Sequence, residues 1–167
     1  MEDKDDFFVN LDTCSPYSLE AVGGKAQNLG KLTSAGFPVP QGIIIPTYTY
    51  ESYIKNKVKN ELTLLLESIN YDNEENIEEK SKQIKKLILN ISFQSELEKE
   101  IVDTLQKLDK NSLWAVRSSA AAEDLPEASF AGQQDSFLNV SAEQITTFIK
   151  KCWASYWNKR AITYRHN

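Results

Sequence analysis

The chain has 167 residues, a formal net charge of −5 and a hydrophobic fraction of 41%. That length suits one domain of ordinary size or two closely packed lobes, and the hydrophobic content excludes wholesale disorder. The net negative charge argues against broad binding to nucleic acids or anionic membranes, because both favour a basic protein face.

The N-terminal residues and the cysteines give no sign of secretion or of a metal centre. The first six residues, MEDKDD, lack the apolar segment of a signal peptide, and no apolar run approaches the ~20 residues of a membrane span. Cys14 and Cys152 lie far apart without CxxC spacing, so neither structural zinc nor a disulfide framework is indicated. We therefore expect a cytoplasmic protein with no membrane or nucleic-acid partner.

The first part of the chain predicts a strand, a helix and a second strand. Residues 7–11 are typical of a short strand, and a helix is expected to open at residues 22–25. One face of this helix should carry the apolar positions Ala26, Leu29, Leu32 and Ala35. Gly36 suits the left-handed residue that ends a helix, and Pro38 prevents continuation. Residues 43–45 then form a short buried strand.

Residues 47–110 are expected to be helical and solvated. Their apolar residues form helical stripes, in three groups: Leu62, Leu65, Leu66 and Ile69; Ile77, Ile84, Leu87, Ile88 and Ile91; and Leu97, Ile101, Leu105 and Leu108. Ser95 and Glu98 have capping-box spacing, so they mark the start of the last of these helices. The acidic run at residues 74–79 fits the start of a helix with a solvated face.

The remaining residues predict two strands and a terminal helix. Residues 113–116 and 136–140 are strand-like, and residues 117–132 between them are rich in Ser, Ala and Gly without a clear period. Ser141 and Gln144 form a second potential capping box. The long amphipathic helix that follows carries an apolar face, at Ile145, Phe148, Ile149, Cys152, Trp153 and Tyr156. The predicted fold class is α+β, helix-rich with short strands.

Three segments could carry chemistry, and each has a plainer alternative. Gly23, Gly24 and Lys25 at a helix start could bind an anion, or could form an ordinary glycine turn with a surface lysine. Arg117 at a strand end could hold a phosphate, or could pair with a carboxylate such as Glu123 or Asp124. Residues 118–132 could fold over a ligand or form an ordinary mobile loop.

Other functional signals are weak. The Gly-x-x-x-x-Gly-Lys-Ser/Thr pattern of a P-loop is absent from the sequence. The single histidine, His166, is expected to be a surface residue. No pair of acids has a spacing that fixes a Mg²⁺ site, so we assign neither catalytic nor metal-binding residues.

Several motifs together resemble the N-terminal ATP-binding domain of the phosphoenolpyruvate synthase, pyruvate phosphate dikinase and rifampicin phosphotransferase family. They are VGGKAQNLG at residues 22–30, GFPVPQG at 36–42, AVRSSA at 115–120, EDLPEASFAGQ at 123–133 and WASYWNKRAITYR at 153–165. The resemblance covers nearly the whole chain and is least specific over residues 55–110. Ala121 departs from it, because the family usually has Thr there.

The resemblance implies the N-terminal half of an ATP-grasp nucleotide-binding domain over residues 1–167, with a helical insertion at about 47–110. Lys25 and Arg117 would contact the phosphates of ATP, while Gly132 and Ser136 would approach the nucleotide. In such enzymes the β-phosphoryl group of ATP passes to a carrier histidine and on to pyruvate, giving phosphoenolpyruvate, AMP and phosphate.

Two alternatives stay open beside the transfer to pyruvate. The acceptor could be rifampicin, or the chain could be a non-catalytic partner-binding module on the same fold. The family's Mg²⁺ ligands belong to the C-terminal lobe, and the carrier histidine to a later domain. Since the sequence matches neither region, we expect this chain to be inactive alone and to have those regions as partners.

Overall fold

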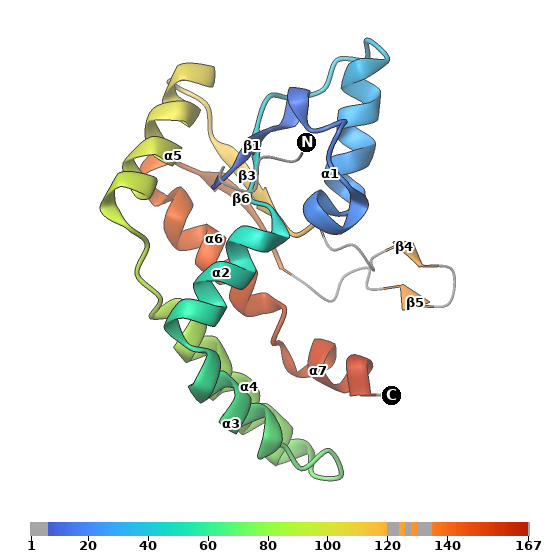
Figure 1. Cartoon of the computed structure of the whole chain (residues 1–167), viewed down its shortest axis with the longest axis vertical. Helices are drawn as coiled ribbons and strands as arrows, with labels where there is room; N and C mark the ends of the chain where they lie inside the picture. The colour runs from blue at the N-terminus through green and yellow to red at the C-terminus, as the bar shows by residue number, and fades with distance from the viewer. Residues whose placement is uncertain (1–6, 120–123, 126–127, 130–134, 167) are drawn as a thin grey trace. The chain divides into compact units, whose positions relative to one another are not determined.

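Helices dominate this computed structural model, and its strands are two to five residues long (Figure 1). The structure describes residues 7–119, 124–125, 128–129 and 135–166. The chain forms two units, of which unit 1 comprises Met1–Ser52, Ser95–Ser112 and Ser119–Ala131. Unit 2 comprises Tyr53–Gln94, Leu113–Ser118 and Gly132–Asn167. The predicted α+β, helix-rich class is confirmed.

Unit 1 contains a small antiparallel sheet beside its first helix. Strand β1 (Val9–Asn10) pairs with β2 (Ile43–Ile44), with Val9 opposite Ile44. A 3-10 helix, η1 (Leu11–Thr13), follows β1 directly, so the strand predicted over residues 7–11 is shorter than expected. The core of these elements consists of Val9, Cys14, Ala21, Val22, Ala26 and Ile44. Unit 1 also includes α5 (Ser95–Leu108) and a short pair, β4 (Asp124–Leu125) and β5 (Ala128–Ser129).

Helix α1 (Leu19–Ser34) ends as predicted but begins earlier. The side chain of Ser18 caps its start by accepting the Ala21 N–H at 3.3 Å. At the other end, Gly36 has a φ of 81°. The Gly36 N–H donates to the Thr33 carbonyl and the Phe37 N–H donates to the Leu32 carbonyl, both at 3.0 Å. These two bonds form a Schellman motif, so the predicted glycine stop is confirmed.

The buried face of α1 is made of small residues, which the apolar spacing did not predict. Leu32 is 43% exposed, whereas Gly30 is buried. A Cβ at Gly30 would lie 2.5 Å from the sulfur of Cys14, which is completely buried. The predicted stripe is therefore wrong at its C-terminal end, because close packing of Cys14 requires a residue without a side chain.

Residues 47–108 are largely helical, as predicted. They form α2 (Thr47–Lys57), α3 (Lys59–Glu67), α4 (Glu74–Leu89) and α5. In unit 2, α3 and α4 lie side by side (Figure 1). The predicted stripes of α4 and α5 are confirmed by their buried members, Ile77, Ile84, Ile88, Leu97, Ile101 and Leu105. The start of α4 is capped by Asn73, whose side chain accepts the N–H groups of Glu75 and Asn76 at 3.0 Å.

The last helical region is split rather than continuous. Helix α6 (Ile145–Ser155) and helix α7 (Lys159–His166) are separated by a turn that contains Trp157. The hydroxyl of Ser81 on α4 donates to the Trp157 carbonyl at 2.7 Å, which stabilises this turn. Ser141 precedes a 3-10 helix, η2 (Ala142–Gln144), and its side chain makes no capping hydrogen bond. The predicted capping box and single long helix are therefore wrong.

Strands β3 (Trp114–Arg117) and β6 (Ser136–Val140) form the antiparallel pair of unit 2. Both strands were predicted from the sequence. One face of the pair packs on α6, where the rings of Phe137 and Phe148 lie 5.2 Å apart. Within the described part of the chain, no helix is long and apolar enough to cross a membrane.

Candidate functional site

The predicted anion-binding helix start coincides with a break inside α1. Gly23 has φ 76° and ψ 165°, which is outside the helical region, and helical geometry resumes at Gly24. Lys25 is the second residue of this new segment and is half-buried. The backbone therefore begins a helix where the glycine motif predicted one, although a short helical turn precedes it.

The loop after β3 contacts this helix start. The N–H of Ala26 donates to the hydroxyl of Ser119 at 2.9 Å. A Cβ at Gly23 would overlap the carbonyl oxygen of Ser119, so only glycine permits this approach. Ser119, from the family-like segment at residues 115–120, thus contacts Gly23 and Ala26 of the segment at 22–30, and all three residues belong to unit 1.

The β3–β6 pair places two other predicted site residues opposite each other. Arg117 is the last residue of β3 and Ser136 the first residue of β6, and they are register partners. Both are exposed, while their neighbours Val116 and Phe137 are half-buried. Because side chains alternate along a strand, Arg117 and Ser136 share the outer face of the pair, away from α6.

Two features fix the start and the twist of β6. The Asp135 N–H donates to the hydroxyl of Ser155 at 3.1 Å, and that hydroxyl donates to the Cys152 carbonyl at 2.7 Å. The register shifts between Trp114 and Val116, and Asn139 on the facing strand has a φ of 57°. This arrangement is a β-bulge, which bends the strand and increases its local twist.

The donor set at these positions suits a polyanion. Among the residues that the structure describes, no carboxylate pairs with Arg117; of the predicted alternative partners, Glu123 lies outside them, and the side chain of Asp124 is not described. A guanidinium beside a hydroxyl offers hydrogen-bond donors to phosphate oxygens. Gly132 also lies outside the described residues. Lys25 belongs to unit 1 and Arg117 to unit 2, and their convergence on one ligand stays a prediction.

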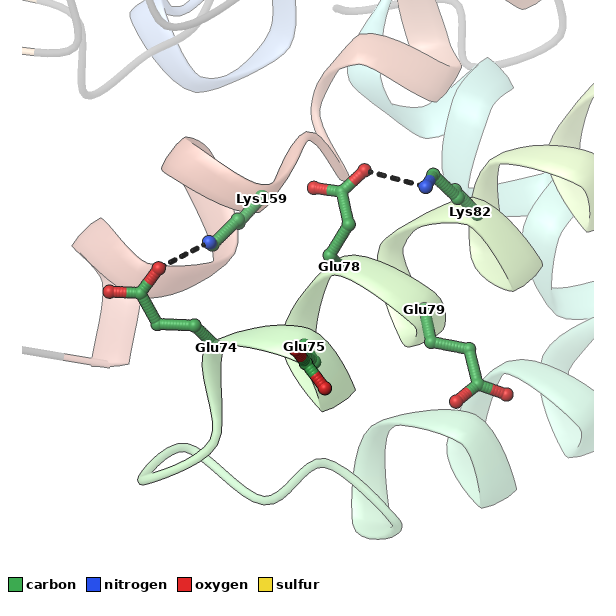
Figure 2. A pocket seen from close by; sticks show the side chains of 6 residues that line it. All are labelled: Glu74, Glu75, Glu78, Glu79, Lys82 and Lys159. Carbon is green, nitrogen blue, oxygen red and sulfur yellow. Dashed lines mark hydrogen bonds and ion pairs between the residues drawn. The ribbon is translucent and has the colours of Figure 1, made fainter.

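An open pocket elsewhere in unit 2 has the opposite charge. Figure 2 shows that it is lined by carboxylates from the first turns of α4 and by two lysines, namely Glu74, Glu75, Glu78, Glu79, Lys82 and Lys159. Lys159 lies 2.7 Å from Glu74, and Lys82 lies 3.2 Å from Glu78. Four carboxylates against two ammonium groups repel a polyphosphate, so we do not place a nucleotide here.

The remaining titratable candidates have structural roles. Burial raises the pKa of the Cys14 thiol, which is neutral and donates to the Ala26 carbonyl at 3.6 Å. His166 is exposed and stacks on Tyr71 with ring centroids 3.6 Å apart, so its predicted surface position is confirmed. No group of three His, Cys, Asp or Glu side chains that could hold a metal occurs in the described ranges.

The family model of the pyruvate phosphate dikinase AMP/ATP-binding domain matches residues 19–167. The chain belongs to this family. It is 40% identical over 95% of its length to a probable phosphoenolpyruvate synthase of Staphylothermus marinus. It is also 40% identical, again over 95% of its length, to a rifampicin phosphotransferase of Bacillus cereus. These alignments span only 20% and 19% of the two relatives.

Membership in this AMP/ATP-binding family supports ATP as the ligand of the chain. The chain is also 39% identical to a phosphoenolpyruvate synthase of Aeropyrum pernix, over 93% of this chain and 20% of that protein. Ser119 is the residue that the sequence argument missed. No local spacing pointed to it, because its partner Ala26 lies 93 residues away in the sequence.

Proposed function

We propose that this chain is the N-terminal lobe of an ATP-grasp-type domain that binds ATP for a dikinase-type phosphotransferase. In the complete enzyme, the β-phosphoryl group of ATP would pass to a carrier histidine and then to pyruvate. The products would be phosphoenolpyruvate, AMP and phosphate. Rifampicin is the second candidate acceptor, because relatives with either name match the chain at 40% identity.

The proposal assigns the phosphates to two cations. Lys25 follows the break at Gly23, at a helix start whose dipole favours an anion. Arg117 shares an exposed strand face with Ser136. This pairing of a guanidinium and a hydroxyl on one face is the observation that carries the proposal. Gly132, four residues before Ser136, would approach the nucleotide from the connecting loop.

Catalysis requires groups that we place in other regions of the complete enzyme. Mg²⁺ would neutralise charge on the transferred phosphoryl group. Its ligands and the carrier histidine belong, in this proposal, to a C-terminal lobe and a phosphohistidine domain. The relatives' greater length accommodates such regions, since the chain spans 20% of the Staphylothermus marinus protein. The chain itself would bind ATP without turnover.

Calorimetric titration of the 167-residue chain with ATP tests the assignment. We expect Lys25→Gln and Arg117→Gln each to weaken binding by about tenfold, because each removes a charge-assisted hydrogen bond to phosphate. Lys31→Gln is the control on the same helix, because Lys31 is exposed and donates to Gln27. Arg160→Gln is the control for an exposed arginine on α7.

Two results would argue against the proposal. If neither Lys25→Gln nor Arg117→Gln changed the affinity for ATP, the nucleotide would not bind at these residues. A chain that dimerises tightly in gel filtration and does not bind ATP would instead favour the partner-binding module.

A further inference from the structure

The second segment of α1 begins without a capping side chain of its own. Gly23 occupies the position before this segment, and the first helical residues are Gly24, Lys25 and Ala26. The residue at that position usually supplies an oxygen that accepts the N–H of the second or third helical residue. Glycine has no such oxygen, so the cap must come from elsewhere.

Ser119 supplies the missing oxygen from 93 residues away. Its hydroxyl accepts the N–H of Ala26, the third residue of the segment, at 2.9 Å. Gly23 lies so close to the Ser119 carbonyl that any side chain there would overlap it. The hydroxyl therefore occupies the place of an N-cap oxygen, and the glycine makes room for the loop that carries it.

We propose that Ser119 is a positioning residue of the nucleotide site. The inference rests on the proposed function, since it concerns the site that Lys25 and Arg117 would form. The cap fixes the helical turn that carries Lys25, because Ala26 is its immediate neighbour in the chain. Ser119 also follows Arg117 by two residues in the sequence.

A neutral cap suits this role better than an acidic one. A carboxylate would satisfy the Ala26 N–H equally well, but it would place a negative charge beside the phosphates. The serine hydroxyl adds no negative charge to the positive end of the helix dipole, which can therefore still attract an anion. Ser119 thus stabilises the helix start without opposing the ligand.

Amide hydrogen exchange of the nucleotide-free chain tests the cap by itself. We expect Ser119→Ala to speed exchange of the Ala26 amide by about fivefold or more, because capping hydrogen bonds are worth about 1 kcal/mol. Ser119→Thr should restore protection, since it keeps a hydroxyl. Ser34→Ala removes another hydroxyl of α1, which donates to the Gly30 carbonyl, and should leave Ala26 unchanged.

A double-mutant cycle on ATP affinity tests the positioning. We expect Ser119→Ala to weaken ATP binding by about fivefold and Ser119→Thr to stay within about twofold of the parent chain. In a Lys25→Gln background, Ser119→Ala should weaken ATP binding much less. The reason is that Ser119 would act by positioning the Lys25 ammonium, which this background lacks. A merely structural role would lower the melting temperature without this non-additivity.

The outcomes separate the two proposals. Unchanged exchange at Ala26 in Ser119→Ala would overturn the cap, and additive losses in the cycle would overturn the positioning role. In either case, ATP binding that depends on Lys25 and Arg117 would leave the proposed function standing. If substitution of Lys25 and Arg117 left ATP affinity unchanged, both the proposed function and the nucleotide role of Ser119 would be overturned, whatever the hydrogen-exchange result.

Discussion

Gly23 meets two separate requirements for glycine. Its φ of 76° lies in the region that side chains disfavour, and an added Cβ would overlap the Ser119 carbonyl. Gly36 meets only the first requirement, with φ 81° and open space around it. Gly42 meets neither, because nothing lies near its added Cβ and its φ is not in the left-handed region. Comparing substitutions at the three positions therefore distinguishes the effect of backbone strain from that of steric overlap.

Alanine at these three positions should give graded losses of stability. We expect Gly23→Ala to lower the free energy of unfolding by about 3 kcal/mol, through strain and overlap together. Gly36→Ala should cost about 1 kcal/mol through strain alone. Gly42→Ala should stay within about 0.5 kcal/mol of the parent chain. Urea denaturation measures the series, and equal losses at Gly23 and Gly36 would contradict the close approach of Ser119.

Predictions for single residues were right where a local sequence rule applies. They failed where the conformation or burial of a residue depends on a residue distant in the sequence. The stop at Gly36 followed from glycine and proline chemistry alone. The burial of Gly30 did not, because it depends on the sulfur of Cys14, sixteen residues earlier. The cap from Ser119 is separated by 93 residues from its donor, and no spacing rule within a helix can find such a partner.

An ion pair links α4 to α7 in unit 2. Glu74 opens α4, and Lys159 opens α7, with their charged atoms 2.7 Å apart (Figure 2). The hydrogen bond from Lys159, together with its charge, lowers the pKa of Glu74. A lowered pKa means that the pair stabilises the fold above the ordinary pKa of a carboxyl group. This contribution is lost as the pH falls through the lowered value.

Removing the lysine should raise the pKa of Glu74 toward its ordinary value. We expect this result for Lys159→Gln, because the hydrogen bond and the positive charge are both lost. Titration of the Glu74 carboxyl carbon by NMR measures the change. Lys82→Gln is the matched control, since Lys82 pairs with Glu78 instead. Identical titration of Glu74 in the parent chain and Lys159→Gln would show that the pair does not persist in solution.

Helices with regular stripes were predicted well, and helix ends set by tertiary contacts were not. The stripe of α4 is confirmed because Ile77, Ile84 and Ile88 are all buried. The break between α6 and α7 has no glycine or proline signal. It is stabilised by hydrogen bonds from α4, in which Ser81 donates to the Trp157 carbonyl and Lys85 to the Asn158 side chain. Such contacts exist only after the helices have packed.

At the scale of the whole chain, the family motifs pointed to residues that the fold pairs with one another. Ala26 and Ser119 come from motifs that are far apart in the sequence, and in unit 1 the Ala26 N–H donates to the Ser119 hydroxyl. Arg117 and Ser136, which the resemblance also singled out, are direct register partners. The sequence thus named candidate residues, and the fold supplied the pairings that local patterns lack.

The central claim is that Lys25 and Arg117 share one triphosphate. A crystal structure of the chain with a non-hydrolysable ATP analogue tests it most directly. We predict that the Lys25 ammonium and the Arg117 guanidinium both lie within about 3 Å of phosphate oxygens of the same nucleotide. A nucleotide bound away from either cation, or two cations too far apart to reach one triphosphate, would contradict the account.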